Sequence, residues 1–131
     1  MHFDLIDRVI ETGTEHLVAL KHVSAAEEYL QDHFPGFPVL PGVMMLETMV
    51  QAGRRLCAPT GDPLVLGGVR ALKYARMVRP GDSLRVEVRV QGVEDGVFDL
   101  KGEVAVIEPD GPSTAASGRF ILRPARVGIP S

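Results

Sequence analysis

The sequence predicts an α+β protein in which an antiparallel sheet wraps around one long helix. Residues 43–52 are apolar almost throughout and follow a proline-rich loop, which indicates a buried helix. This helix should end near Cys57, because Pro59 disfavours helical geometry at the residue before it. Residues 84–122 instead alternate apolar and polar side chains between turn signals, as half-buried strands do. Such a sheet must hide one face, and the long helix is the element able to cover it.

The N-terminal part predicts a hairpin followed by a short helix. Apolar runs over residues 5–10 and 16–23 flank a Thr-Gly-Thr turn and are typical of two paired strands. Ser24 and Glu27 have the spacing of a capping box, so a short helix is expected over residues 25–30. That helix would lead the chain into the proline-rich loop.

After the long helix, the pattern predicts four more strands. Asp95-Gly96 is a strong hairpin signal, and Asp110-Gly111 indicates another turn. The expected strands cover residues 64–70, 84–90, 98–106 and 114–122. Residues 124–131 are expected to form a loose tail, and the chain as a whole, 1–131, is expected to be a single domain.

Composition narrows the function classes. The net charge is -3, so no basic excess points to nucleic acid. No apolar run approaches the ~20 residues of a membrane-spanning helix. The single cysteine excludes an internal disulfide and fits the reducing cytoplasm, which is the expected location. His2, His16 and His22 lack ligand spacing to one another, so no metal site is expected.

The loop and the helix together carry residues suited to acid–base chemistry. His33 lies at the start of a stretch in which three prolines and two glycines specify a stiff, shaped loop. Glu47 and Gln51 are four residues apart, so they share one face of the apolar helix. A carboxyl group in a buried helix must be paired, hydrogen-bonded or kept neutral by a raised pKa. An imidazole and a desolvated carboxyl group form a natural base and acid pair.

These residues resemble a known family. The run H-F-P-G-F-P-V-L-P-G-V-M-M-L-E-T-M-V-Q, from His33 to Gln51, resembles the signature of the FabZ-type beta-hydroxyacyl-acyl carrier protein dehydratases of the FabA/FabZ family. Residues 3–9, 21–24 and 73–82 resemble further family segments, so the likeness spans residues 3–123. The resemblance implies the hotdog fold, a homodimer or a trimer of dimers, and no cofactor.

The resemblance also assigns roles to individual residues. It implies that His33 is the catalytic histidine and Glu47 the catalytic acid. The amide of Gly42 would polarise the substrate carbonyl, and Gln51 would hydrogen-bond around the acid. The implied reaction converts a 3-hydroxyacyl thioester, carried on the phosphopantetheine of acyl carrier protein, to the trans-2-enoyl thioester, in fatty acid or related acyl-chain biosynthesis.

Further residues are expected to bind the acyl chain and the carrier. The predicted substrate tunnel is lined by Phe34, Val43, Val50 and Arg54. The predicted docking patch for the acidic carrier consists of Lys73, Arg76 and Arg79. The chain departs from the family at Asp32, where glycine is usual, and at Arg54, where the family has a small or apolar residue. Arg54 would shorten or polarise the tunnel, or pair with Glu47.

Two other functions fit the same residues. In a hotdog acyl thioesterase, Glu47 would activate water. In a non-catalytic acyl-carrier binding module, Arg54 would have disabled the site. The His33 loop favours the dehydratase over the thioesterase.

Overall fold

The computed structural model describes residues 5–24, 42–58 and 63–125. These residues form one helix and six strands. The elements in chain order are β1 (Arg8–Thr12), β2 (His16–His22), α1 (Gly42–Cys57), β3 (Leu64–Tyr74), β4 (Ser83–Glu94), β5 (Val97–Glu108) and β6 (Gly111–Pro124).

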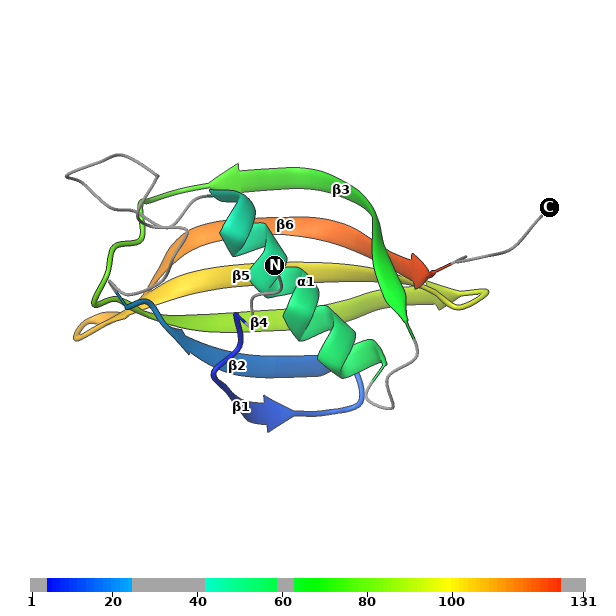
Figure 1. Ribbon diagram of the computed structural model, residues 1–131, viewed down its shortest axis with the longest axis horizontal. Helices are drawn as coiled ribbons and strands as arrows, with labels where there is room; N and C mark the ends of the chain where they lie inside the picture. The colour runs from blue at the N-terminus through cyan, green and yellow to red at the C-terminus, as the bar shows by residue number, and fades with distance from the viewer. Residues whose placement is uncertain (1–4, 25–41, 59–62, 126–131) are drawn as a thin grey trace.

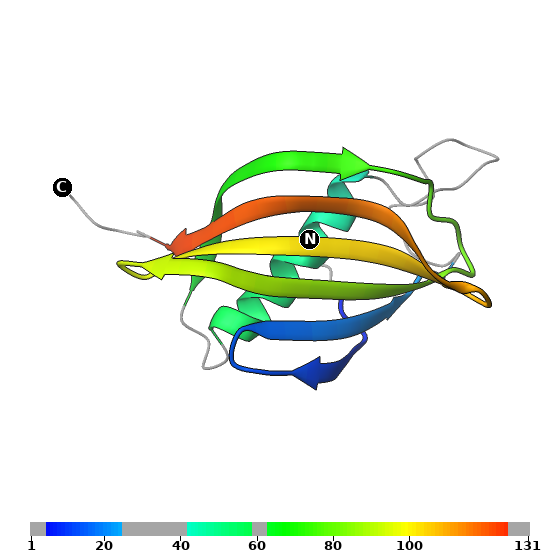
Figure 2. The same cartoon turned by 180° about the vertical axis from the view of Figure 1, so that it is seen from behind.

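The six strands form one sheet in the order β1-β2-β4-β5-β6-β3, and every pairing in it is antiparallel. Helix α1 runs across one face of this sheet, which curves around it (Figure 1). Seen from behind, the sheet lies in front of the helix (Figure 2). The predicted α+β arrangement, a sheet wrapped around one helix, is therefore confirmed.

The hydrophobic core lies between the inner face of the sheet and one side of α1. Met49 and Ala52 from the helix meet Leu100, Phe120 and Leu122 from the central strands, and each of these side chains is at most 1% exposed. Two glycines allow the helix to lie close to the sheet. A Cβ atom at Gly53 would lie 3.1 Å from Phe120, and one at Gly102 would lie 2.7 Å from the Met49 Sδ.

Most predicted elements are confirmed, with shifted boundaries. The helix ends at Cys57 as expected. The β4–β5 hairpin turns at Asp95 and Gly96, whose φ angles of 54° and 79° fit the predicted two-residue turn. The third strand extends past its predicted end at residue 70 to Tyr74, with irregularities in its pairing to β6. The predicted helix at 25–30 lies outside the described residues, as does the tail beyond residue 125, while Pro124 still belongs to β6.

The first strand was predicted too early in the chain. It covers Arg8–Thr12 rather than residues 5–10. Leu5 and Ile6 precede it and are 1% and 3% exposed. Their apolar character therefore reflects burial in the core and not pairing in the sheet, which periodicity alone does not distinguish.

The prediction that α1 is buried on nearly every side is wrong for a single chain. Within the predicted run, residues 43–52, Val43 is 65% exposed and the Glu47 side chain is 39% exposed. The sheet covers one side of the helix, and no described element forms a second layer over the other. An apolar pattern predicts that a surface will be covered, but it does not say by what.

Candidate active site

Glu47 lies in the middle of α1 on the side that is not packed against the sheet. Its side chain is 39% exposed, so the expected full desolvation is not present in the single chain. Its Oε1 atom is 3.5 Å from Nη1 of Arg54, two helical turns further on. Of the alternatives predicted for Arg54, the pairing with Glu47 is therefore present. Glu47 is available to a ligand from the exposed side.

Gly42 begins α1, so its N–H has no partner within the helix and is oriented to donate beyond the helix end. The Tyr74 ring lies against Gly42, because a Cβ at this position would come within 2.8 Å of the Tyr74 Cζ. Desolvation of the half-exposed Tyr74 side chain raises the pKa of its hydroxyl. Sequence reasoning assigned Tyr74 no role, although it belongs to the basic segment that resembles the family.

Gln51 is engaged by the N-terminal segment. Its Oε1 accepts a hydrogen bond of 2.7 Å from the backbone N–H of Leu5. This bond ties the chain before β1 to the same helix face that carries Glu47. This side chain therefore anchors the N-terminal segment beside the site, and the predicted hydrogen bonding of Gln51 around the acid stays a prediction.

The remaining predicted site residues separate into three groups. His33 and Phe34 lie outside the described residues. Val50 is 1% exposed and belongs to the core, whereas Val43 faces outward at the start of the helix. Arg54 is held by two partners, since its Nε also donates to the Leu64 carbonyl at 3.0 Å. Of the predicted site residues, helix α1 carries Gly42 at its first position and brings Glu47 and Arg54 into contact.

The predicted carrier-docking residues lie at and after the end of β3. Lys73 is exposed and has no ion pair with any described residue. Arg76 pairs with Glu108 and donates to the Met77 carbonyl, which reduces its free charge. The backbone N–H of Arg79 donates to Asp82. Of this patch, Lys73 is the cation most available to a partner.

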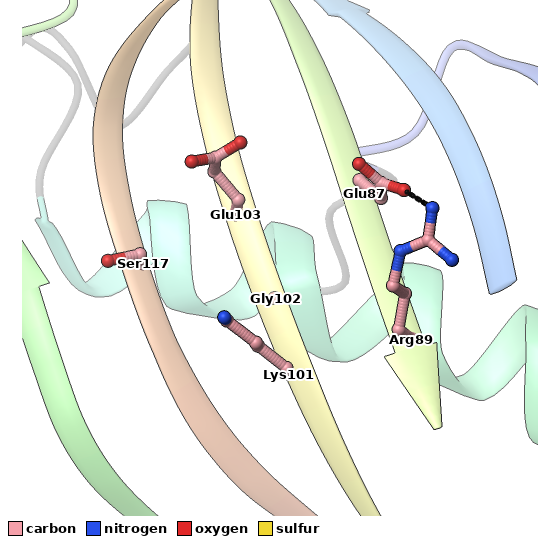
Figure 3. Close-up of a pocket in the computed structure, with 6 residues that line it drawn as sticks. All are labelled: Glu87, Arg89, Lys101, Gly102, Glu103 and Ser117. Carbon is pink, nitrogen blue, oxygen red and sulfur yellow. Dashed lines mark ion pairs between the residues drawn. The ribbon is translucent and has the colours of Figure 1, made fainter. Parts of the chain in front are cut away.

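A separate hollow of about 210 Å³ lies on the outer face of the sheet. Figure 3 shows its lining, with the helix behind the strands: Glu87, Arg89, Lys101, Gly102, Glu103 and Ser117. Arg89 lies 2.7 Å from Glu87, so opposite charges within the hollow neutralise each other. None of the predicted site residues lines this hollow, and the sheet separates it from Glu47.

Other chemistry finds little support in the described residues. Burial raises the pKa of the Cys57 thiol to about 11, so it is a poor nucleophile at neutral pH. No group of three or more His, Cys, Asp and Glu side chains within residues 5–24, 42–58 and 63–125 is placed to hold a metal ion. Helix α1 is too short and too polar to cross a membrane.

Comparison with known proteins decides the family. The ApeI-like family model, described as ApeI dehydratase, matches residues 9–108. The chain belongs to this dehydratase family. The 3-hydroxyacyl-[acyl-carrier-protein] dehydratase FabZ of Latilactobacillus sakei is 44% identical over 117 residues, which cover 85% of this chain and 82% of the relative. The FabZ of Koribacter versatilis is 35% identical over 129 residues, which cover 93% and 82%. The predicted resemblance to FabZ-type dehydratases is confirmed.

Solved structures support the predicted hotdog fold of this dehydratase family member. The dehydratase heterocomplex ApeI:P from Xenorhabdus doucetiae matches with a TM-score of 0.74 and 16% identity, covering 93% of this chain and 99% of that one. The protein smu.793 from Streptococcus mutans, solved with acetyl CoA, matches with a TM-score of 0.72 and 14% identity, covering 95% and 92%. At these identities the likeness shows the fold, and the predicted hotdog architecture is confirmed.

Proposed function

We propose that this chain is a 3-hydroxyacyl-acyl carrier protein dehydratase of fatty acid or related acyl-chain biosynthesis. The observation that carries the proposal is the accessible carboxylate of Glu47, five residues after the first amide of α1, in a chain of the ApeI-like dehydratase family. A lone cysteine fits the cytoplasm as the compartment we propose.

The proposed reaction removes water from the C2 and C3 atoms of the acyl chain. Neutral His33 takes the C2 proton, and the electron pair left behind forms the C2–C3 double bond. The C3–O bond breaks as Glu47 supplies a proton, so the hydroxyl group leaves as water. The N–H of Gly42 donates to the thioester oxygen while negative charge develops there, helped by the positive end of the helix dipole.

Two substitutions test these roles. We expect His33→Ala and Glu47→Gln each to lower kcat by about 100-fold or more, the usual contribution of an acid–base group. The substrates are 3-hydroxybutyryl and trans-2-enoyl thioesters on phosphopantetheine, with unfolding curves to confirm the fold of each variant. Near wild-type kcat in either variant would contradict the role of that residue. Release of free thiol without enoyl formation would favour the thioesterase alternative, and binding without turnover would favour the binding module.

We further propose that the active form is a homodimer, alone or within a trimer of dimers. The exposed side of α1, with Val43 65% exposed, needs a cover that the described chain does not supply. Strand β3 is an edge of the sheet and carries the partly exposed apolar residues Leu66 and Val69. A second copy would cover such an edge and complete the desolvation of Glu47. The family resemblance adds that His33 of one chain faces Glu47 of the other.

Subunit mixing tests the shared site. Chains carrying His33→Ala and chains carrying Glu47→Gln are unfolded together and refolded. About half of the dimers are then mixed, each with one intact site, so about a quarter of wild-type activity should return. Verified subunit exchange with no recovered activity would rule out a site shared between chains.

We propose that the acidic carrier docks at Lys73, the most available cation of the predicted patch. We expect Lys73→Glu to raise KM for carrier-bound substrate, with little change for a small pantetheine thioester. Arg123→Glu is the matched control, because it reverses a charge at a distant point of the same strand pair. In the β3–β6 register Arg123 of β6 lies opposite Val65, near the start of β3, whereas Lys73 near its end lies opposite Ser117. Equal effects of the two charge reversals would place the docking surface elsewhere.

A further inference from the structure

Arg54 connects the helix, the proposed acid and the edge strand of the sheet. Its Nη1 lies 3.5 Å from Glu47 Oε1, and its Nε donates to the Leu64 carbonyl at 3.0 Å. Leu64 is the first residue of β3. A guanidinium group is a planar fork, so fixing Nε at one point also fixes the direction of its terminal nitrogens. The hydrogen bond to strand β3 therefore fixes the orientation of the Arg54 guanidinium group.

The Leu64 carbonyl is free to accept this bond because of the local register. Leu64 lies opposite Pro124 in β6, and the ladder bond next to this pair runs from the Ala125 N–H to the Pro63 carbonyl. In an antiparallel ladder this makes Leu64 and Pro124 a pair that does not exchange hydrogen bonds, so the Leu64 carbonyl faces away from β6. Since β3 is the outermost strand on that side, the guanidinium takes the place of a neighbouring strand.

The consequence for Glu47 is that its two oxygens differ. Oε1 faces Arg54, while Oε2 has no hydrogen bond with any described residue. We propose that Arg54 is a positioning residue that fixes the Glu47 carboxylate and leaves Oε2 as the oxygen that exchanges a proton with substrate. This inference rests on the proposed function, because it names how the acid of that reaction is oriented.

Position matters more than charge in this arrangement. The Arg54 and Glu47 side chains are 37% and 39% exposed, so their attraction contributes little to folding stability. A displacement of about 1 Å in a catalytic group, by contrast, can cost about 100-fold in rate. The side chain of Glu47 is long, and without Arg54 no described residue would hold it in one rotamer.

The test compares Arg54→Ala and Arg54→Lys with Arg55→Ala. Arg55 is the matched control, because it is the other basic residue in the last turn of α1. We expect Arg54→Ala to lower kcat about tenfold or more, with KM changed less than about twofold. Arg54→Lys should restore part of kcat, because an ammonium group can reach one of the two partners but cannot bridge both as the fork does. Arg55→Ala should stay close to wild type.

The outcomes separate this inference from the proposed function. If the wild-type protein is active and Arg54→Ala has the same kcat as Arg55→Ala, the positioning role of Arg54 is overturned. A loss that appears in KM instead of kcat would also overturn it, since that would indicate substrate binding. A wild-type protein without dehydration or hydration would refute the proposed function itself. Urea unfolding shows whether Arg54→Ala is folded. If it is not, the comparison of Arg54→Lys with the wild type takes its place. A kcat of Arg54→Lys equal to that of the wild type would then overturn the positioning role of the guanidinium group.

Discussion

Replacing Gly102 with alanine should destabilise the protein, although alanine normally stabilises a strand relative to glycine. A Cβ atom at this position would lie 2.7 Å from the Met49 Sδ and 3.1 Å from Phe120, both fully or almost fully buried. Removing a strand glycine gains about 0.5–1 kcal/mol, whereas overpacking a core costs about 1–3 kcal/mol. We therefore expect a net loss of about 1 kcal/mol in the free energy of unfolding.

Urea unfolding at fixed protein concentration measures this loss. A double-mutant cycle with Met49→Ala isolates its cause, because the shortened side chain leaves space for the new methyl group. In that background Gly102→Ala should stabilise, giving a coupling of about 1–2 kcal/mol. Gly92→Ala is the control, since a Cβ there meets nothing within 4 Å. Stabilisation by Gly102→Ala in the wild-type background, or zero coupling with Met49, would refute the claim that close helix–sheet packing requires this glycine.

Three further predictions concern individual side chains. Cys57 should react with iodoacetamide at pH 8 at least about tenfold more slowly than a small thiol, because its raised pKa of about 11 leaves little thiolate. A rate similar to that of the small thiol would show that the Cys57 thiol is accessible and ionisable. Desolvation disfavours ionised Glu87, but hydrogen bonds and charges from Arg85 and Arg89 outweigh it and lower its pKa. Glu87→Gln should therefore lower the free energy of unfolding by less than about 1 kcal/mol at pH 7, and this difference should vanish as the pH falls through the lowered pKa of the folded protein; a difference that persists in acid would contradict the linkage. If Arg54 also lines the acyl tunnel, Arg54→Ala should raise kcat/KM for longer acyl chains relative to four-carbon ones, and an unchanged profile would place it outside the tunnel.

Local patterns were sufficient for much of the fold. Alternation predicted the central strands, Asp95-Gly96 predicted the tight turn, and Pro59 predicted where the helix ends. The helix period also placed Glu47 and Gln51 on one face. These features depend on neighbours within a few residues, so the sequence contains all the information they require.

The missing features depend on contacts between distant segments. The hydrogen bond from Leu5 to Gln51 joins residues 46 positions apart, and it holds the start of the first apolar run against the helix, ahead of strand β1. The contact of Tyr74 with Gly42 depends on β3 reaching the start of the helix. The exposed side of α1 could not be predicted either, because hydrophobicity shows only that a surface needs a partner.

The sheet order has a consequence for synthesis on the ribosome. Strand β3 follows the helix in the chain, yet its one neighbour in the sheet, β6, is the last strand to be made. The helix packs on β2, which is made before it, but also on β4, β5 and β6, which emerge after it. A nascent chain therefore carries an apolar helix and an unpaired strand until translation is nearly complete. Such long-range closure slows folding and favours aggregation. Chains that stop before Gly111 should depend on chaperones or be degraded.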